Sequence, residues 1–388
     1  MARPLVPTRR ELLAGLIEAP SVSSVSPEFD MSNRTAAERI AGWLEALGFA
    51  VEMQEIAGHP GKLNVIGTLG RGPGGLVLAG HMDTVPYDHD QWDSDPFKLT
   101  ERDGHYYGLG IADMKGFIAL AIEAAAKHSV KDLKQPLIVL ATADEESSMC
   151  GGQALADAGK PKARYAVIGE PTALRPVHRH KGILMEAVKV IGHSGHSSDP
   201  SLGRNALEGM FRAVDGLLKF RSEMQHRHRD DHFKVPVPTM NLGHIKGGDN
   251  PNRICPDCEL HFDVRLLPGM SLQAVRAEVR ERIEAALDGS GFKVEFRSLF
   301  RGTEPLNTPG TSELVKAAEE LTGHASEAVA FATEGPFLQR LGMQTLILGP
   351  GDIAVAHQPN ESLSQDRIEP TLKILEQLIQ RFCIAHAP

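Results

Sequence analysis

Carboxylate and imidazole side chains recur in this chain at points where apolar segments end. They are His81, Asp83, Asp113, Glu145, Glu146, Glu170 and His357. Mixed histidine and carboxylate donors suit zinc, with cobalt or manganese as alternatives. Carboxylates brought close together repel one another, so one would have to stay protonated unless a cation lies between them. If the fold gathers these groups, a bound divalent metal is the natural way to neutralise them.

Each group also has an ordinary structural interpretation when it is taken alone. His81 could be a histidine at a strand end, with Asp83 facing solvent, and an aspartate such as Asp113 before a helix is a favoured N-cap. The three consecutive acids at 144–146 would by default form a solvated turn. The combination favours a site, because ligands of open α/β sheets bind at the carboxyl ends of the strands. Asp83 would then fix the tautomer of His81.

Alternating strand and helix patterns predict the frame that positions these groups. A capping box at 8–11 precedes an apolar helical stripe, and further helices are expected at 40–47 and 114–127. Short apolar runs predict strands at 50–53, 64–68, 76–79, 137–141 and 165–168. Several of these runs are uniformly apolar, as in strands buried on both faces. The pattern predicts an α/β domain with a mixed sheet.

A different pattern occupies the middle of the chain. Strands are expected at 183–191, 239–245, 259–266 and 292–296, with helices at 205–220 and 272–287. Their order, β-α-β-β-α-β, is that of a ferredoxin-like unit. The α/β pattern returns after about residue 298, with a strand at 345–348 and an amphipathic helix at 372–382. We therefore expect a catalytic domain from residues 1–181 and 298–388, and an inserted domain from 182–297.

Composition narrows the class of protein. The 388 residues carry a formal net charge of −9, which argues against a nucleic-acid partner, since such a partner would require a basic face. The four cysteines are too few for a disulfide framework, so we expect reduced thiols. The N-terminal segment has no apolar run typical of a signal peptide, and no stretch approaches the ~20 apolar residues of a membrane span. These features predict a cytoplasmic protein without a membrane partner.

Longer motifs give a specific resemblance. They include LVLAGHMDTVP from Leu76, YGLGIADMKG from Tyr107, LATADEE from Leu140, IGEPT from Ile168, SGHSSDP from Ser194, NRIC from Asn252, DVRLLPGM from Asp263 and AHQP from Ala356. With these motifs in this order, the chain resembles the zinc-dependent aminoacylase and metallopeptidase family 20 over nearly its whole length. TEGPF from Thr333 is similar to the deacetylase branch of that family.

The resemblance implies a role for each site residue. Asp113 would bridge two metal ions, zinc first and cobalt as a substitute. His81 and Glu170 would complete one metal site, and Glu146 and His357 the other. Glu145 would be the general base and Asp83 would orient His81. On the inserted domain, implied to be a lid and dimerisation domain, His196 would stabilise the oxyanion, and Arg265 and Asn252 would bind the substrate carboxylate and the reacting centre.

The same resemblance implies hydrolysis of N2-acetyl-L-ornithine to ornithine and acetate, a step of arginine biosynthesis, by a homodimer. Glu334 is a candidate partner for the substrate ammonium, and the alternative is that it caps a helix starting at Pro336. Succinyl-diaminopimelate desuccinylase and broader N-acyl-amino-acid amidohydrolase or peptidase activities share the metal ligands and stay open. A metal-bearing binding protein without turnover is an alternative of a different class, although such a protein would have no need of Glu145.

Overall fold

The computed structural model describes residues 7–385, and these form two compact units. The first unit contains the described residues up to His178, together with Thr308–Glu327 and the residues from Glu334 onward. The second contains Arg179–Asn307 and Ala328–Thr333. The chain therefore passes between the units at 178/179, 307/308, 327/328 and 333/334.

The largest sheet is mixed, as the sequence predicts. Its strand order is β1 (Ala50–Glu55), β2 (Leu63–Leu69), β6 (Leu137–Thr142), β3 (Leu76–His81), β7 (Tyr165–Ile168), β15 (Gln344–Ile347), β8 (Val177–His180) and β13 (Leu306–Asn307), with β14 (Glu327–Val329) beside β8. The four neighbours β6, β3, β7 and β15 run parallel, whereas β1, β2 and β8 pair antiparallel. The carboxyl ends of β3, β6 and β7 consequently meet at one edge.

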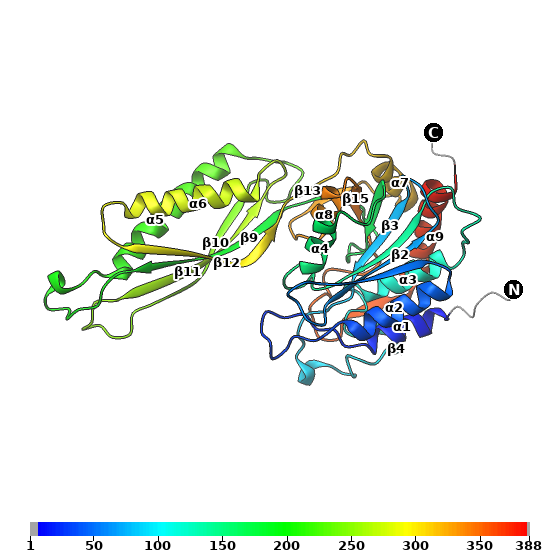
Figure 1. Ribbon diagram of the computed structural model, residues 1–388, viewed down its shortest axis with the longest axis horizontal. Coiled ribbons are helices and arrows are strands. Elements are labelled where there is room, and N and C mark those ends of the chain that lie inside the picture. Colours follow the sequence, from blue (N-terminus) through cyan, green and yellow to red (C-terminus); the bar gives the residue numbers. More distant parts are fainter. Residues whose placement is uncertain (1–6, 386–388) are drawn as a thin grey trace. The chain divides into compact units, whose positions relative to one another are not determined.

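Helices cover both faces of this sheet in the first unit. One layer contains α1 (Arg9–Ile17), α2 (Arg34–Ala46), α3 (Lys115–Ala125) and α9 (Ile368–Ile379), and the opposite layer contains α4 (Cys150–Ala158) and α8 (Gly335–Arg340), as seen in Figure 1. The strands β3, β6 and β7 are buried at every residue because they lie between these two layers.

Smaller elements complete the first unit. They are α7 (Glu313–Thr322), a three-stranded sheet of β16 (Ser362–Ser364), β5 (His105–Tyr107) and β4 (Thr100–Arg102), short 3-10 helices at His89–Gln91 and Gln365–Arg367, and a π-helical turn at Gln380–Ile384. The predicted capping box is confirmed, since the Thr8 hydroxyl accepts from the Glu11 backbone N–H and the Glu11 carboxylate accepts from the Thr8 N–H.

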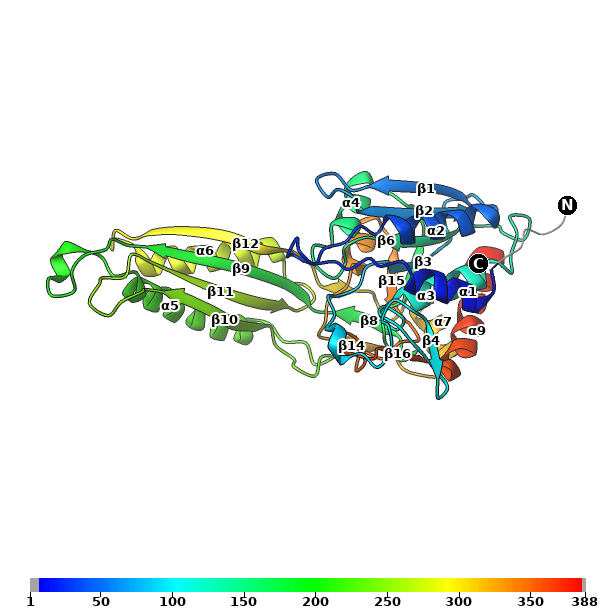
Figure 2. The same ribbon diagram turned by 90° about the horizontal axis from the view of Figure 1, so that it is seen from below.

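The second unit is a four-stranded antiparallel sheet with two helices on one face. Its strands β10 (Thr239–Gly247), β11 (Asp257–Leu266), β9 (Gly182–Ile191) and β12 (Lys293–Thr303) lie side by side in this order in Figure 2, with α5 (Ala206–Arg227) and α6 (Leu272–Leu287) against them and a 3-10 turn at Pro200–Leu202. Burial alternates strictly along β11, because only the helix side of the sheet is covered. β12 continues through the expected domain limit at 297/298 to Thr303.

The helix predicted at 272–287 is confirmed as α6. The helix predicted at 205–220 is present as α5, but it extends seven residues beyond its predicted end. Arg227 pairs with Glu278 at 2.6 Å and Glu223 pairs with Arg282 at 2.6 Å, so ion pairs between α5 and α6 hold the charged extension in a helix. Among residues 7–385, no helix combines the length and apolar character needed to span a membrane.

A tight contact beneath the sheet edge predicts a large effect of a small substitution. A Cβ atom on Gly169 would lie 1.9 Å from Cγ of the buried Phe117 on α3, so Gly169→Ala should lower the free energy of unfolding by about 1–3 kcal/mol or more. Gly42→Ala is the matched control, since nothing lies within 4 Å of its added methyl group on α2. It should raise that free energy by roughly 0.5–1 kcal/mol. Urea unfolding followed by circular dichroism measures both, and equal midpoints would contradict this packing.

Candidate metal centre

His81 lies at the end of β3, and a hydrogen bond to the main chain fixes the orientation of its ring. Its side chain is 1% exposed, and Nδ1 donates to the backbone carbonyl of Asp83 at 3.0 Å. The Asp83 carboxylate, expected to orient the ring, lies farther from Nδ1, at 3.8 Å. With its proton on Nδ1, the neutral imidazole presents the lone pair of Nε2 to the site. Asp83 therefore positions the ring through its main chain.

Asp113 lies between two imidazoles. Its Oδ1 atom is 3.1 Å from Nε2 of His81, and its Oδ2 atom is 3.4 Å from Nε2 of His357. The alternative that Asp113 caps α3 is wrong, because Met114 occupies the N-cap position and the helix has no side-chain cap. The two carboxylate oxygens of Asp113 are thus directed to different imidazoles.

The acids after β6 and β7 complete the group. Nε2 of His357 lies 2.9 Å from Oε1 of Glu146, and Nε2 of His81 lies 3.9 Å from Oε2 of Glu170. Donor atoms of His81, Asp113 and Glu146 all lie within 4.8 Å of one another, and so do those of His81, Glu145 and Glu170. Thus the structure brings together all five predicted metal ligands and the predicted base.

Asp144, the first acid of the predicted solvated turn, belongs to a different contact. Its side chain is buried, and Oδ1 lies 2.6 Å from the ammonium of Lys62, which also pairs with Asp30 at 2.6 Å. Only the next two acids face His81 and His357. The left-handed backbone of Asp144, with φ of 58°, accompanies this change of direction within three residues.

The pKa values of these groups are shifted strongly from their usual values. Burial raises the pKa of the Glu145 and Glu170 carboxyl groups well above the usual value. Burial would lower the pKa of His81, but its hydrogen bond with Asp113 and the nearby acids raise it well above normal. Hydrogen bonds with Asp113 and Glu146 raise the pKa of His357 to about 10. Without a cation, the site would balance its charge by holding extra protons.

Metal ions fit this donor set. Oε1 of Glu170 and Oδ1 of Asp83 are buried and have no hydrogen-bond partner in the part of the chain described. Buried carboxylate oxygens without partners are costly unless something else satisfies them. The available donors are imidazole nitrogens and carboxylate oxygens, which suit zinc and related divalent ions. The residues thus fit two metal ions that share Asp113.

Glu361 is a supporting residue that the sequence did not single out. Its buried carboxylate accepts from three backbone N–H groups, those of Gly110 at 2.8 Å, Ala112 at 2.7 Å and Asp113 at 2.9 Å. Burial raises the pKa of Glu361 to about 8, against the lowering effect of these hydrogen bonds. Its position four residues after His357 was the only signal in the sequence. Glu361 ties the segment carrying Asp113 to the segment carrying His357.

Three predicted residues belong to the second unit. Nδ1 of His196 accepts from the Ser198 backbone N–H at 3.2 Å, which leaves Nε2 to carry the ring proton of the neutral form. The backbone carbonyl of Asn252 accepts from the Ser197 N–H at 3.1 Å, so the segments of His196 and Asn252 lie together. Nε of Arg265 donates to Asp263 at 3.1 Å. Their relation to the metal centre stays a prediction.

Glu334 lies in the first unit and is 2% exposed. It occupies the N-cap position of α8, but its side chain makes no cap hydrogen bond, so the alternative of a helix-capping side chain is wrong. Its carboxylate is hydrogen-bonded to Thr142, and Oε1 has no partner among the described residues. Burial raises the pKa of Glu334 to about 7.

Comparison with known proteins identifies the family. The model of peptidase family M20/M25/M40 matches residues 77–381. This chain belongs to that family. It is 44% identical over 378 residues to acetylornithine deacetylase of Pasteurella multocida, with 97% of this chain and 99% of the relative covered. The enzyme of the same name from Edwardsiella ictaluri is 45% identical, with 97% and 98% covered.

Solved structures of the M20 family share this fold. An M20 metallo-carboxypeptidase from Sulfolobus solfataricus superposes with a TM-score of 0.75 at 19% identity, covering 96% of this chain and 99% of the other. Membership of the M20 family confirms two predictions made from the motifs, the resemblance itself and a metallohydrolase that cleaves amide bonds. The mixed α/β fold expected of that family is also confirmed.

Replacing Glu361 tests how the metal centre is supported. Glu361→Gln keeps the size of the side chain but replaces one acceptor oxygen with an NH2 group, which cannot accept from a backbone N–H. We expect the affinity of the protein for zinc to fall about 10–100-fold, as is typical when a ligand loses its supporting partner. Competition with a chromophoric chelator measures this affinity. Glu369→Gln is the matched control, since Glu369 is 74% exposed and pairs with Arg9 on the surface. Unchanged affinity in Glu361→Gln would rule out the supporting role.

Proposed function

We propose that this M20 family member hydrolyses N2-acetyl-L-ornithine to L-ornithine and acetate. Sequence identity of 44% and 45% to two acetylornithine deacetylases, over 97% of this chain, supports this substrate. The observation that carries the chemistry is the convergence of Asp113, two imidazoles and three glutamates at the carboxyl edge of β3, β6 and β7. Such a group is suited to hydrolysis of an unactivated amide.

Two divalent metal ions would be held here, most naturally zinc, with cobalt as a substitute. His81 and Glu170 would ligate one ion, Glu146 and His357 the other, and Asp113 both. When bound, the metal ions supply Lewis acidity and lower the pKa of a water molecule into the neutral range. The protein contributes the fixed positions of the ligands, through Glu361 and the Asp83 carbonyl.

Glu145 would act as the general base and then as the general acid. Its carboxylate oxygen lies close to the donor atoms of His81 and Glu170. If both metal ions share Asp113, the other four ligands complete the two sites and Glu145 is left free to act as a base. Glu145 takes a proton from the attacking water as the C–O bond to the acetyl carbon forms. The same proton then passes to the nitrogen of ornithine as the C–N bond breaks, and acetate leaves. General acid–base catalysis of this kind contributes typically about 10²–10⁴-fold.

The second unit would supply groups that bind substrate. His196 carries a proton on Nε2 when neutral, so it is suited to donate to the oxyanion that develops on the acetyl carbonyl. Arg265 uses Nε for Asp263, and its two terminal nitrogens form a fork suited to the substrate carboxylate. Asn252 would contribute a side-chain amide beside His196.

The second unit would also serve as a ferredoxin-like lid and as the dimerisation domain. Its elements follow the order β9-α5-β10-β11-α6-β12, and both helices lie on one face. Large apolar side chains are exposed on this unit, notably Phe211 at 75%, Ile245 at 57% and Leu202 at 55%. Exposed apolar side chains of this size are available for contact with another protein. A second copy of this chain is the proposed partner.

Glu334 would receive the side-chain ammonium of the substrate. Its Oε1 atom is buried and has no hydrogen-bond partner within residues 7–385, and a carboxylate in that state gains from a cationic neighbour. The substrate ammonium would also favour the ionised form of a group whose pKa burial raises to about 7. The preference for ornithine derivatives over neutral acyl amino acids would depend on this carboxylate.

Removing the proposed base should separate catalysis from metal binding. Glu145→Gln is expected to retain the metal content of the wild-type protein and to lose about 10²–10⁴-fold in kcat on N2-acetyl-L-ornithine. Elemental analysis and steady-state kinetics measure the two quantities, and Glu38→Gln on the exposed face of α2 is the control. A variant with near-normal kcat would show that another group moves the proton. A wild-type protein that binds metal without any turnover would instead be a binding protein.

Replacing Glu334 tests the substrate assignment. Glu334→Gln removes the charge and keeps the shape, so kcat/KM for N2-acetyl-L-ornithine should fall about tenfold or more, equivalent to about 1.4 kcal/mol. N-acetylmethionine has no ammonium on its side chain, and its kcat/KM should change little. Equal losses on both substrates would remove the proposed pairing. In the wild-type protein, a higher kcat/KM for N-succinyl-diaminopimelate than for N2-acetyl-L-ornithine would overturn the proposed substrate.

A further inference from the structure

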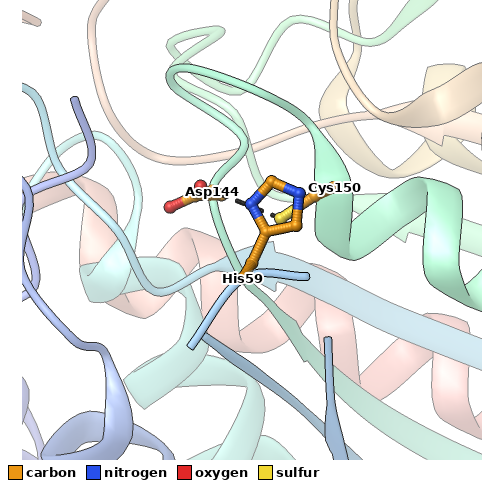
Figure 3. A group of neighbouring side chains, drawn as sticks. All are labelled: His59, Asp144 and Cys150. Atoms are coloured by element: carbon orange, nitrogen blue, oxygen red, sulfur yellow. Dashed lines mark hydrogen bonds between the residues drawn. The ribbon is translucent and has the colours of Figure 1, made fainter. Parts of the chain in front are cut away.

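A second group of side chains of metal-ligating types lies in the first unit. Two of its members belong to the loop at 144–150, here called the catalytic loop because it carries Glu145. His59 lies on the turn between β1 and β2, Asp144 on the segment that follows β6, and Cys150 is the first residue of α4 (Figure 3). Their donor atoms lie within 4.8 Å of one another. None of the proposed catalytic residues belongs to this group, and Asp144 contacts Lys62 and Cys150.

The two carboxylate oxygens of Asp144 face different neighbours. Oδ1 accepts from Ser23 at 2.9 Å and pairs with the Lys62 ammonium at 2.6 Å. Oδ2 faces Cys150, with Sγ at 3.8 Å, and accepts from the Ser148 hydroxyl at 3.1 Å. Lys62 has a second acid, Asp30, at 2.6 Å. Coordination through Oδ2 would therefore leave the Lys62 ion pairs intact.

The other two donors are accessible and chemically distinct. Cys150 is a free thiol of intermediate exposure, and the imidazole of His59 is exposed on its turn. A thiolate, an imidazole and one carboxylate oxygen form a donor set for zinc or a softer cation, and they disfavour magnesium and calcium, which prefer oxygen ligands. Three protein donors with water in the fourth position would make a tetrahedral site that stays open to solvent.

We propose that His59, Asp144 and Cys150 form an additional binding site for zinc or a similarly thiophilic divalent cation, separate from the catalytic centre. Binding replaces the proton of the Cys150 thiol, which burial otherwise keeps in place by raising its pKa to about 12. The site would hold the turn carrying His59 against the loop at 144–150.

Occupancy of this site would act on catalysis through the main chain. The Asp144 carbonyl accepts from the N–H groups of Ser148 at 3.2 Å and Met149 at 2.6 Å, and Asp144 directly precedes Glu145. A cation bound through Oδ2 of Asp144 would compete with the hydrogen bond from the Ser148 hydroxyl and so alter this loop. Zinc in excess of the catalytic requirement should therefore inhibit the enzyme.

Cobalt titration of the full-length protein tests the site with a signal that the catalytic ligands cannot give. Sulfur-to-cobalt charge transfer produces a near-ultraviolet absorption band, whereas the proposed catalytic donors are only nitrogen and oxygen. We expect this band in the wild-type protein and its loss in Cys150→Ser. His59→Ala should weaken the cobalt affinity of the band about tenfold or more. His89→Ala, an exposed histidine with 77% of its side chain accessible, is the matched control and should leave the band unchanged.

Each outcome decides the proposal. Absence of the band at saturating cobalt, or a band that persists in Cys150→Ser, would overturn it, the second by assigning the signal to Cys255, Cys258 or Cys383. Should Cys150→Ser fail to fold, His59→Ala provides the same test at an exposed position. Excess zinc should inhibit the wild-type and His89→Ala proteins but inhibit His59→Ala at least tenfold less strongly. Equal inhibition of all three would exclude an action on the catalytic loop. The absorption band does not depend on which acyl amino acid is the substrate.

Discussion

Mutual repulsion among buried carboxylates is the constraint that the first unit has to satisfy. Glu145, Glu146, Glu170 and Asp113 lie around His81 at one edge of the sheet. Their burial raises the pKa of three of these groups, and the imidazoles become strongly basic in return. A pair of divalent cations would relieve this repulsion with fixed charge, and protons could then move only where catalysis needs them. The same burial that makes the group costly alone would strengthen its attraction for a divalent cation.

Rigid support makes this arrangement possible. The parallel strands β3, β6 and β7 deliver their last residues to one edge, and their burial on both faces leaves them little freedom. The Asp83 carbonyl fixes the ring of His81, and Glu361 joins the segment of Asp113 to the segment of His357. Phe117 packs directly under Gly169, next to Glu170. The proposed ligands are therefore positioned by contacts with the main chain, and the Glu361 carboxylate supplies those made at 110–113.

Residue patterns predicted the strands that carry the site because those strands are short, apolar and buried on both faces. They also predicted that the five candidate metal ligands and Glu145 would converge, since each follows an abrupt element end or stands in a family motif. Asp144 and Glu361 escaped prediction, because their roles depend on contacts with Lys62 and with the 110–113 backbone, far away in sequence. The helix at 150–158 was missed because Gly151 and Gly152 weaken its pattern, although small residues are required there by Ala143 and Phe337.

The order of strands in the large sheet has a consequence for synthesis on the ribosome. β15 pairs with β7 and with β8, yet it is made more than 150 residues after them, once the whole span 179–307 has emerged. The second unit is nearly continuous in sequence and can form while β7 still has an open edge. Until Gln344–Ile347 arrives, that edge exposes unpaired backbone N–H and C=O groups, flanked by apolar side chains, to other chains. The same holds for any slow parallel pairing over a long separation. His357 and Glu361 arrive later still, so the nascent protein cannot assemble the full set of proposed metal ligands before the sheet is able to close.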